Sequence, residues 1–371
     1  MTTEIAPDVP QEIAFPIARP PATSTGILGW LRANLFNSVF NTILTLLAVY
    51  FLAMTVPPLI RWSLIDAIWS APNGQACRDG GACWAFIHEK LRFILFGRYP
   101  YEEQWRPLFV VLIFVGMILA SCDRRLWGRP LILLWAGGFV VIAVLMWGGV
   151  LGLSYVDTSL WSGLPLTLIL AVVGMGLAFP FAILLALGRR SQLPAVRWVS
   201  IAYIELVRGV PLITVLFMAS VVLPLFLPAG VTIDKLLRAQ VAFILFAAAY
   251  LAEVVRGGLQ AIPKGQIEAA DSLGLGYWRR TRLIVLPQAL RLVIPPLVNN
   301  FIGAFKNTSL VLIIGLFDLL TTANTALTDP NWQGFAAEAY VFTAAIYFSF
   351  CFFMSRYSQM IERDLNQGRR R

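Results

Sequence analysis

The sequence has little charge and almost no histidine. Asp, Glu, Lys and Arg make up 13% of its 371 residues and histidine occurs once, whereas 58% of the residues are hydrophobic and the mean hydropathy is +0.73. About a quarter of the residues in a typical soluble domain are charged, so this composition excludes a soluble fold. The apolar runs show no sustained alternation of the kind that a lipid-facing β-barrel needs. We therefore predict an all-α integral membrane protein.

Missing motifs exclude several activities. No G-x-x-x-x-G-K-[ST] stretch is present, so the chain lacks an ATP site of this kind. The single histidine, His88, lies outside the apolar segments, and no acid–base or nucleophile set lies within them, which disfavours an intramembrane enzyme. A zinc site at Cys77 and Cys83 would need two more ligands, and His88 is the one nearby candidate, so we predict no metal. The net charge of +9 comes without a nucleic-acid-binding signature.

Eight segments are apolar over a length that can cross a bilayer. They lie at about 39–60, 107–122, 131–152, 164–187, 203–227, 238–256, 292–318 and 337–355. The chain before them has five prolines in its first 26 residues and lacks a basic region at its start. This composition predicts a tail over 1–38 instead of a cleaved signal peptide.

The basic residues indicate the orientation of these segments. If the N-terminus is cytoplasmic, 19 of the 29 Lys and Arg residues fall on the inside, eight fall outside, and Arg208 and Lys306 fall within spans. Inside loops of membrane proteins are enriched in Lys and Arg. We therefore expect both termini in the cytoplasm and an external loop over 61–106.

The cysteines fall into two groups. Cys77 and Cys83 lie together in the external stretch "NGQACRDGGACW", where an oxidising compartment favours a disulfide between them. Cys122 and Cys351 lie near or within spans and are expected to pack there.

A polar segment over 257–291 interrupts the apolar chain. Pro263 suits the start of a helix over 266–273, and Gly274 and Gly276 suit its end, before a second helix over 277–286. The segment is too polar to span and is expected inside. Such a helical hairpin could serve as a lever for a docked partner or could pack only beneath its own bundle. Residue chemistry alone leaves both interpretations open.

The spacing within this segment resembles a known signature. The residues Glu268, Ala269, Ala270, Gly274, Ile284, Leu286 and Pro287 fit the EAA pattern, EAA-x3-G-x9-I-x-LP, of the membrane subunits of bacterial ABC importers. Surrounding stretches, including "ELVRGVPLI", "LPQALRLVIPPLVNNFI" and "KNTSLV", resemble the polar amino-acid branch of that family. The resemblance covers about 160–360, and the longer N-terminal part is similar to the longer permease of general L-amino-acid importers.

The resemblance implies a fold and a function. It implies a five-helix type I importer core over 156–371, with the EAA loop at 257–291, after a three-helix extension over 39–155. It implies a permease in the bacterial inner membrane that takes up polar L-amino acids delivered by a periplasmic binding protein. Two cytoplasmic ATPase subunits would bind ATP and Mg, and the seven EAA residues would contact them. The importer would have a second membrane half, expected to be a related but different permease, although a homodimer stays open. An ion-coupled secondary transporter is the alternative, but we see no second copy of the proline-broken region, which such folds often contain.

Two acid–base pairs lie at the inner ends of adjacent spans. Glu205 and Arg208, like Glu253 and Arg256, share the spacing E-x-x-R-G, so each pair lies on one helix face and can neutralise itself. The pairs either stabilise helix ends at the headgroups or line the cytoplasmic gate of a pathway.

Lys306 lies deep in the seventh span, about 21 Å along a helix from Leu292. The helix around it is interrupted by Pro295 and Pro296. The polar neighbours that share this depth, and that could contact substrate with it, are Asn299, Asn300, Asn307, Thr308 and Ser309. A charge at this depth needs a partner or a water-filled cavity. Lys306 could therefore meet a substrate carboxylate, or it could pair with Asp318 and only stabilise the fold.

Overall fold

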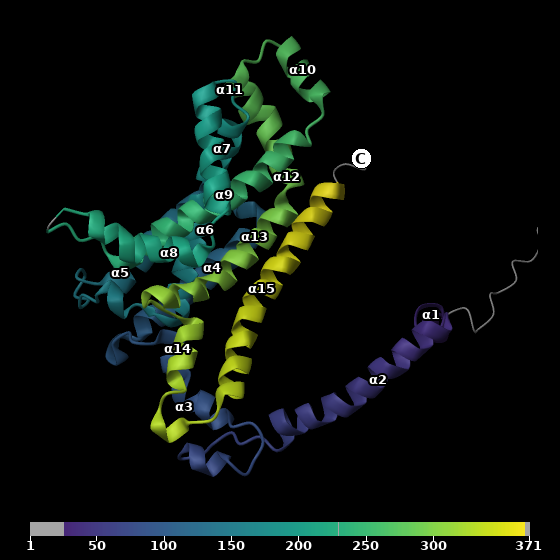
Figure 1. The fold of residues 1–371 in the computed structure, drawn as a ribbon, viewed down its shortest axis with the longest axis vertical. Coiled ribbons are helices and arrows are strands. Elements are labelled where there is room, and N and C mark those ends of the chain that lie inside the picture. The colour runs from purple at the N-terminus through teal and green to yellow at the C-terminus, as the bar shows by residue number, and fades with distance from the viewer. Residues whose placement is uncertain (1–25, 229, 368–371) are drawn as a thin grey trace, which may run out of the picture. The chain divides into compact units, whose positions relative to one another are not determined.

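The computed structural model describes residues 26–228 and 230–367, and the chain divides into two units, residues 1–67 and 68–371 (Figure 1). Within the described ranges almost all regular structure is helical, and β1 (Phe317–Asp318) is a two-residue strand that pairs with Ser162 and Gly163. The prediction of an all-α protein with several membrane-crossing helices is confirmed.

The first unit contains two helices, α1 (Gly26–Asn34) and α2 (Val39–Ile60). The Ser38 hydroxyl caps α2 by accepting the N–H of Asn41 at 3.2 Å. The predicted tail over 1–38 therefore differs from the structure in its last part, because residues 26–34 are helical, while residues 1–25 lie outside the described residues. None of the α2 side chains is buried, as expected for a helix that is apolar on every side and needs lipid or another helix around it.

The second unit contains the remaining helices. In chain order they are α3 (Trp84–Phe96), α4 (Trp105–Cys122), α5 (Arg129–Trp147), α6 (Gly163–Arg189), α7 (Pro194–Arg208), α8 (Leu212–Phe217), α9 (Lys235–Gln260), α10 (Lys264–Ser272), α11 (Tyr277–Arg280), α12 (Leu286–Leu292), α13 (Ile294–Asn307), α14 (Leu319–Ala326) and α15 (Ala336–Gln367). Shorter 3-10 or π turns cover Arg61–Ile65 in the first unit and, in the second, Gly74–Cys77, Tyr101–Glu103, Arg124–Leu126, Thr158–Leu160, Met218–Val222, Leu223–Phe226, Thr281–Val285, Thr308–Ile314 and Pro330–Trp332.

Seven of the eight expected spans correspond to helices that are long and apolar enough to cross a membrane. The prediction of one continuous span over 203–227 is wrong, because the helical segments Pro194–Arg208 and Leu212–Phe226 meet at an angle of 102°. The break lies at Gly209 and Val210, directly before Pro211. Proline lacks a backbone N–H and disfavours the helical conformation of the residue before it, so the helix ends there.

Two other spans end differently from their predicted limits. The third, predicted to reach residue 152, ends at Trp147 because Gly148 and Gly149 have positive φ angles of 67° and 74°. The seventh is α-helical only as far as Asn307 and continues as a 3-10 helix to Ile314, where Gly315 stops it in the left-handed conformation.

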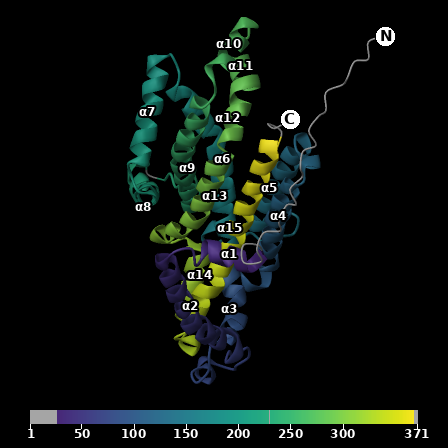
Figure 2. The same ribbon diagram turned by 90° about the vertical axis from the view of Figure 1, so that its right-hand side faces the viewer.

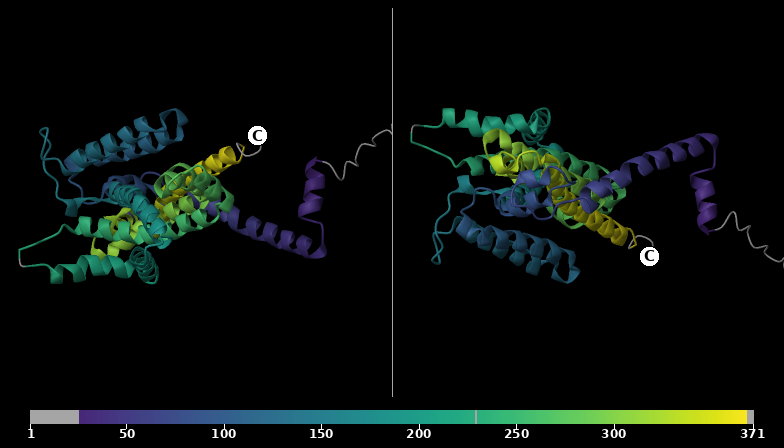
Figure 3. Two further views of the ribbon diagram at one scale, coloured as in Figure 1. Left: turned by 90° about the horizontal axis from the view of Figure 1, so that it is seen from above. Right: turned by 90° about the horizontal axis from the view of Figure 1, so that it is seen from below.

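The helices α6 and α9 form the centre of the second unit. Their contact is built from small residues, and a Cβ atom at Gly174 would lie 2.8 Å from the Phe243 ring, so only glycine fits there. Small residues allow close approach of helices inside a membrane. The α4–α5 pair lies along one side of this centre, as the view from above shows (Figure 3).

The two ends of the second unit differ. Helices α10 and α11 form one end, which we call the hairpin end, and α3 and α14 form the other, which we call the cap end (Figures 1 and 2). The predicted loop over 61–106 belongs largely to the cap end and contains a helix, α3, that the prediction lacked. At 13 residues α3 is too short to span a membrane, so a search for spans passes over it.

A disulfide, a hydrogen bond and an ion pair stabilise the cap end, and the last two connect distant parts of the sequence. Cys77 and Cys83 form a disulfide. The backbone N–H of Cys83 donates to the Glu338 carboxylate at 2.9 Å, and Lys90 Nζ lies 2.5 Å from the Asp329 carboxylate. These contacts join the segment before α4 to the first turn of α15 and to the segment between α14 and α15.

Candidate functional site

The EAA segment forms a helical hairpin, residues 264–292, at the hairpin end. Its first helix, α10, begins after Pro263 and ends in a Schellman motif, in which Gly274 N–H donates to Asp271 O at 2.9 Å and Leu275 N–H to Ala270 O at 3.1 Å. Gly274 has a φ of +70°, a conformation that glycine adopts without strain. The predicted helix, glycine turn and helix thus correspond to the structure.

The signature residues occupy different positions on the EAA hairpin. Glu268 and Ala269 are exposed on α10, whereas Ala270 is buried beneath them. Ile284 and Leu286 are half-buried in the second arm, and Pro287 is exposed in the first turn of α12. A charged and small-residue face is therefore presented to solvent, where another protein can contact it.

Two polar contacts hold the arms of the EAA hairpin together. Arg280 forms an ion pair with Asp271, and Gln288 Nε2 donates to Gln266 Oε1 at 3.2 Å. Sequence reasoning missed these residues because pairs nine and 22 positions apart do not share one helix face. The second arm packs on α9 at Gly258, where a Cβ atom would lie 2.7 Å from Ala289 O. Motion of the hairpin is thereby linked to α9.

Three of the four predicted gate residues, Glu205, Glu253 and Arg256, form a charge cluster with an arginine that sequence reasoning missed. Arg189 NH1 at the end of α6 lies 2.8 Å from Glu205 Oε1 on α7 and 3.4 Å from Glu253 Oε2 on α9. Glu253 also accepts two hydrogen bonds of 2.9 Å from Arg256 Nε. The prediction that each pair neutralises itself is correct for Glu253 and Arg256.

The same prediction is wrong for Glu205 and Arg208. Glu205 pairs with Arg189, and the Arg208 guanidinium lies over the Tyr250 ring, 5.6 Å from its centroid. Arg208 is the last residue before the break in the helix, and the chain turns there, which directs its side chain toward α9. The cluster therefore joins α6, α7 and α9, whereas the sequence predicted two separate pairs, each within one helix.

A cavity of about 280 Å³ lies between α6, α8, α9 and α13. We call it the asparagine cavity, because Asn299, Asn300 and Asn307 line it. An asparagine amide can both donate and accept hydrogen bonds, so this set can bind an ammonium and a carboxylate group. No charged side chain is among its lining residues. The arrangement suits a small molecule whose own charges balance.

Aromatic side chains of α9 form the opposite wall of the asparagine cavity. Phe243, Phe246 and Tyr250 line it, and the Phe246 and Tyr250 rings lie 4.8 Å apart. Aromatic rings supply apolar area and attract cations to their faces. Their spacing of three and four residues already placed them on one face of the predicted helix, and this signal could have identified them from the sequence.

Lys306, Thr308 and Ser309 do not line the asparagine cavity. Lys306 is exposed, the Thr308 hydroxyl donates to Phe305 O at 2.8 Å, and the Ser309 hydroxyl donates to Lys306 O at 3.0 Å. The three residues mark the end of α13, where the chain changes to a 3-10 helix and rotates their side chains away from the asparagines.

The alternative, a pair between Lys306 and Asp318, does not form in the described part of the chain. The Asp318 carboxylate accepts hydrogen bonds from the N–H of Thr321 at 3.0 Å and from the Tyr347 hydroxyl at 3.0 Å, and it caps α14. Asp318 is fully buried, and these donors satisfy its oxygen atoms without a cation.

The bundle of apolar helices, the broken helix and the exposed hairpin define a membrane transport subunit. The chain belongs to the family of binding-protein-dependent transport system inner membrane components, whose family model matches residues 178–367. That match includes α7 to α13, and hence the EAA hairpin and most of the asparagine cavity. The predicted resemblance to an ABC importer permease is confirmed.

Two relatives align along nearly the whole chain. The inner membrane amino-acid ABC transporter permease protein YhdY of Escherichia coli K12 is 51% identical over 348 residues, which cover 93% of this chain and 95% of YhdY. The glutamate/glutamine/aspartate/asparagine transport system permease protein BztC of Rhodobacter capsulatus is 40% identical over 424 aligned positions, covering 94% of this chain and 96% of BztC. The extension before α6 is therefore shared with longer permeases.

Shorter relatives align with the core alone. The glutamate/aspartate import permease protein GltK of Escherichia coli O157:H7 is 35% identical over 194 residues, which cover 51% of this chain and 85% of GltK. In the crystal structure of an amino acid ABC transporter with histidines, one chain is 32% identical, covers 54% of this chain and 92% of its own length, and superposes with a TM-score of 0.49.

Membership of this family has direct consequences. The chain is a multi-pass membrane subunit of an importer and is not itself an enzyme. Importers of this kind work with an ATPase and with a periplasmic binding protein, which are separate components.

Proposed function

We propose that this chain is one membrane half of an ABC importer for polar L-amino acids, and that its asparagine cavity holds the substrate during transport. The observation that carries the proposal is the cavity's lining of three asparagines opposite three aromatic rings, without a charged side chain. An amino acid is a zwitterion whose carboxylate and ammonium groups need both donors and acceptors. The relatives named for the transport of amino acids support this substrate class.

The remaining assignments follow from the same proposal. The hairpin end faces the cytoplasm together with both termini, as the distribution of Lys and Arg favours. The exposed Glu268 and Ala269 contact the ATPase, which binds ATP and Mg on its own chain. The second permease half is a related but different chain, and the cluster of Arg189, Glu205 and Glu253 lines the cytoplasmic gate.

Uptake in proteoliposomes tests the transport function. The complete complex, with its ATPase and a binding protein, should accumulate a labelled amino acid such as glutamate or glutamine only when ATP is supplied inside. Uptake driven by an ion gradient without ATP would favour the secondary-transporter alternative and overturn the proposal. Separately tagged copies of this chain that copurify would indicate a homodimer instead of two different halves.

A glycine in the wall tests the asparagine cavity itself. Gly303 lines this cavity, and a Cβ atom there meets nothing within 4 Å, so Gly303→Phe fills the cavity without a backbone clash. Uptake should be lost while the ATPase still copurifies. Gly137→Phe is the matched control, because Gly137 on α5 has the same open surroundings and does not line the asparagine cavity. Normal uptake by the Gly303 variant would place the substrate elsewhere.

A further inference from the structure

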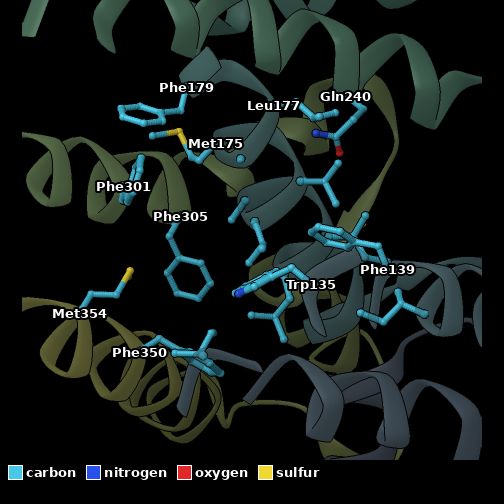
Figure 4. Close-up of a pocket in the computed structure, with 18 of the residues that line it drawn as sticks. Trp135, Phe139, Met175, Leu177, Phe179, Gln240, Phe301, Phe305, Phe350 and Met354 are labelled. Atoms are coloured by element: carbon cyan, nitrogen blue, oxygen red, sulfur yellow. The ribbon is translucent and has the colours of Figure 1, made fainter. Parts of the chain in front are cut away.

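A larger cavity of about 1070 Å³ lies between α5, α6, α13 and α15. Its lining is apolar, and Figure 4 shows Phe139 of α5, Phe301 and Phe305 of α13 and Phe350 and Met354 of α15 around the open space. Helices α5, α6 and α15 are long and apolar enough to cross a membrane, and so is α13 together with its 3-10 continuation to Ile314. We call this space the apolar cavity. Its walls offer a molecule from the bilayer an environment like that of lipid chains.

The apolar cavity is long enough for a lipid acyl chain. On α5 its lining extends from Trp135 to Trp147. Twelve residues of helix rise about 18 Å, and one leaflet supplies about half of the ~30 Å hydrocarbon core. Trp147 is the last residue of α5, so the cavity continues beyond the leaflet at the hairpin end.

A turn with basic residues adjoins the hairpin end of the apolar cavity. Trp135 and Tyr357, which line the cavity, donate to the Ser121 hydroxyl at 3.0 Å and to Ser121 O at 2.8 Å, respectively. The turn that follows Ser121 carries Arg124 and Arg125, and Arg129 begins α5. A negatively charged headgroup at this opening would meet a concentration of positive charge.

The opposite end of the apolar cavity contains an acidic residue. Asp234 lines it there, with its carboxylate accepting the Thr158 hydroxyl at 2.5 Å and the N–H of Leu237 at 2.9 Å. Lys235 follows Asp234 directly, so the charge at this end is balanced, whereas the turn at the hairpin end carries the excess of basic residues.

We propose that the apolar cavity binds one anionic phospholipid, with its headgroup at Arg124, Arg125 and Arg129 and its acyl chains between α5 and the α13–α15 pair. Its place in the cytoplasmic leaflet rests on the orientation proposed above, whereas the site itself does not depend on the substrate assignment. The lipid fills the space between the N-terminal extension and the transport core, and it thereby joins the two.

Native mass spectrometry of the complete complex tests the proposal. The complex is reconstituted in bilayers of phosphatidylethanolamine and phosphatidylglycerol, extracted in mild detergent and analysed for retained lipid. Wild-type complex should retain one phosphatidylglycerol for each copy of this chain. Gly176→Phe should abolish that retention, because Gly176 lines the apolar cavity and a Cβ atom there meets nothing within 4 Å. Leu184→Phe is the matched control on the same helix, where Leu184 is 62% exposed and does not line the cavity.

The headgroup contact has its own test. Arg125→Gln or Arg129→Gln should lower the retained phosphatidylglycerol about fivefold, the factor expected for one basic residue at an anionic membrane surface. Arg197→Gln, an exposed arginine of α7 near the hairpin end, is the charge control and should change nothing. A lipid chain makes no hydrogen bond, so Gln240→Leu, which removes a polar group from the lining, should leave retention unchanged.

Three outcomes would overturn the proposal. Equal retention in the wild type and Gly176→Phe would place the lipid elsewhere. Loss in the arginine variants without loss in Gly176→Phe would restrict the lipid to the surface. Loss in Gln240→Leu would indicate an occupant that hydrogen-bonds within the cavity. Copurification of the ATPase shows in each case that the variant has folded, and the milder Gly176→Leu replaces Gly176→Phe if the latter has not.

Discussion

Arg189 of α6 and Glu205 of α7 form an ion pair of 2.8 Å between the last turns of the two helices. The same guanidinium lies 3.4 Å from Glu253 on α9, five residues before the tight contact between Gly258 and the second arm of the EAA hairpin. One arginine therefore joins the broken helix to the helix that carries the hairpin. A movement of the hairpin that shifts α9 must either move α7 with it or break these pairs.

The first prediction concerns the strength of this link. In a double-mutant cycle, Arg189→Gln and Glu205→Gln should show a coupling energy of about 0.2–1 kcal/mol, because Glu205 is 55% exposed and solvent weakens such pairs. Unfolding of the detergent-solubilised protein measures it. Amino-acid uptake should fall more than stability in Arg189→Gln. A coupling energy of zero, with uptake equal to that of an Arg197→Gln control, would show that the pair has no role.

A second prediction concerns the turn of the EAA hairpin. Gly274 has a φ of +70°, so Gly274→Ala should cost roughly 1–2 kcal/mol locally and displace the second arm. Copurification of the ATPase should decrease while insertion into the membrane stays normal. Gly276, with a φ of −64° and open space around it, is the matched control, and Gly276→Ala should bind the ATPase as the wild type does. If both variants bind the ATPase equally well, the conformation of the turn at Gly274 has no role in coupling to the ATPase.

Charge reversal at Glu268 isolates the contact with the partner. Glu268 is exposed on α10, and Glu268→Lys leaves the Asp271–Arg280 ion pair within the EAA hairpin in place. ATPase copurification and uptake should therefore be lost without a change in the melting temperature of this chain. The control is Lys264→Glu, an opposite charge reversal one turn earlier on the same helix. If both variants lose ATPase binding, the contact depends on the surface of α10 as a whole and not on the signature position.

The EAA hairpin was predictable because its determinants are local. Pro263 limits the start of α10, Gly274 is the one residue type that enters the left-handed turn freely, and both effects act within a few residues. The spans followed from hydropathy for the same reason. The cause of the break before Pro211 is equally local. The sequence did not predict it, because a search for long apolar runs gives one proline little weight when apolar residues lie on both sides.

The asparagine cavity and the charge cluster could be predicted only in part. Asn299, Asn300 and Asn307 were identified from their polarity at membrane depth, but their partners Phe243, Phe246 and Tyr250 lie about 50 residues earlier on another helix. The sequence contains no signal for which helices pack together, and small rotations decide which side chains face the same space. Lys306 illustrates this, since one step along α13 separates it from Asn307 and turns it out of the cavity.

A further prediction concerns a buried arginine between α4 and α5. Arg106 is fully buried, and it donates to Leu145 O at 2.7 Å and to Ser154 O at 3.0 Å while pairing with Glu103. Arg106→Leu leaves Glu103 and two carbonyl groups without this partner, and we expect a loss of about 3–5 kcal/mol in the free energy of unfolding. Chemical unfolding in detergent measures it, and a loss below the ~1 kcal/mol of an exposed pair would contradict the assignment.

The glycine beside this arginine should tolerate no side chain. Gly148 has a φ of +67°, and a Cβ atom would lie 1.9 Å from Ser154 O and 2.5 Å from the Arg106 guanidinium. Gly148→Ala should therefore destabilise the α4–α5 pair and expose it to proteolysis. Gly137→Ala, within α5 and without neighbours inside 4 Å, should be neutral or slightly stabilising. Equal protease resistance of the two variants would show that the turn at Gly148 can adjust.

The last prediction concerns acid and the cap end. The Lys90 ammonium, and then the N–H of Asn331, lower the pKa of the Asp329 carboxyl below its ordinary value. A carboxyl whose pKa is lower in the folded state stabilises that state above its unfolded pKa of about 3.9, and this contribution is lost as the pH falls through the folded value. The difference in melting temperature between the wild type and Lys90→Gln should thus stay constant from pH 7 to about pH 5 and shrink below about pH 4. Asp329→Asn should abolish that pH dependence. If the difference in melting temperature grew on acidification instead, the Lys90 ammonium would not be what lowers the pKa of Asp329.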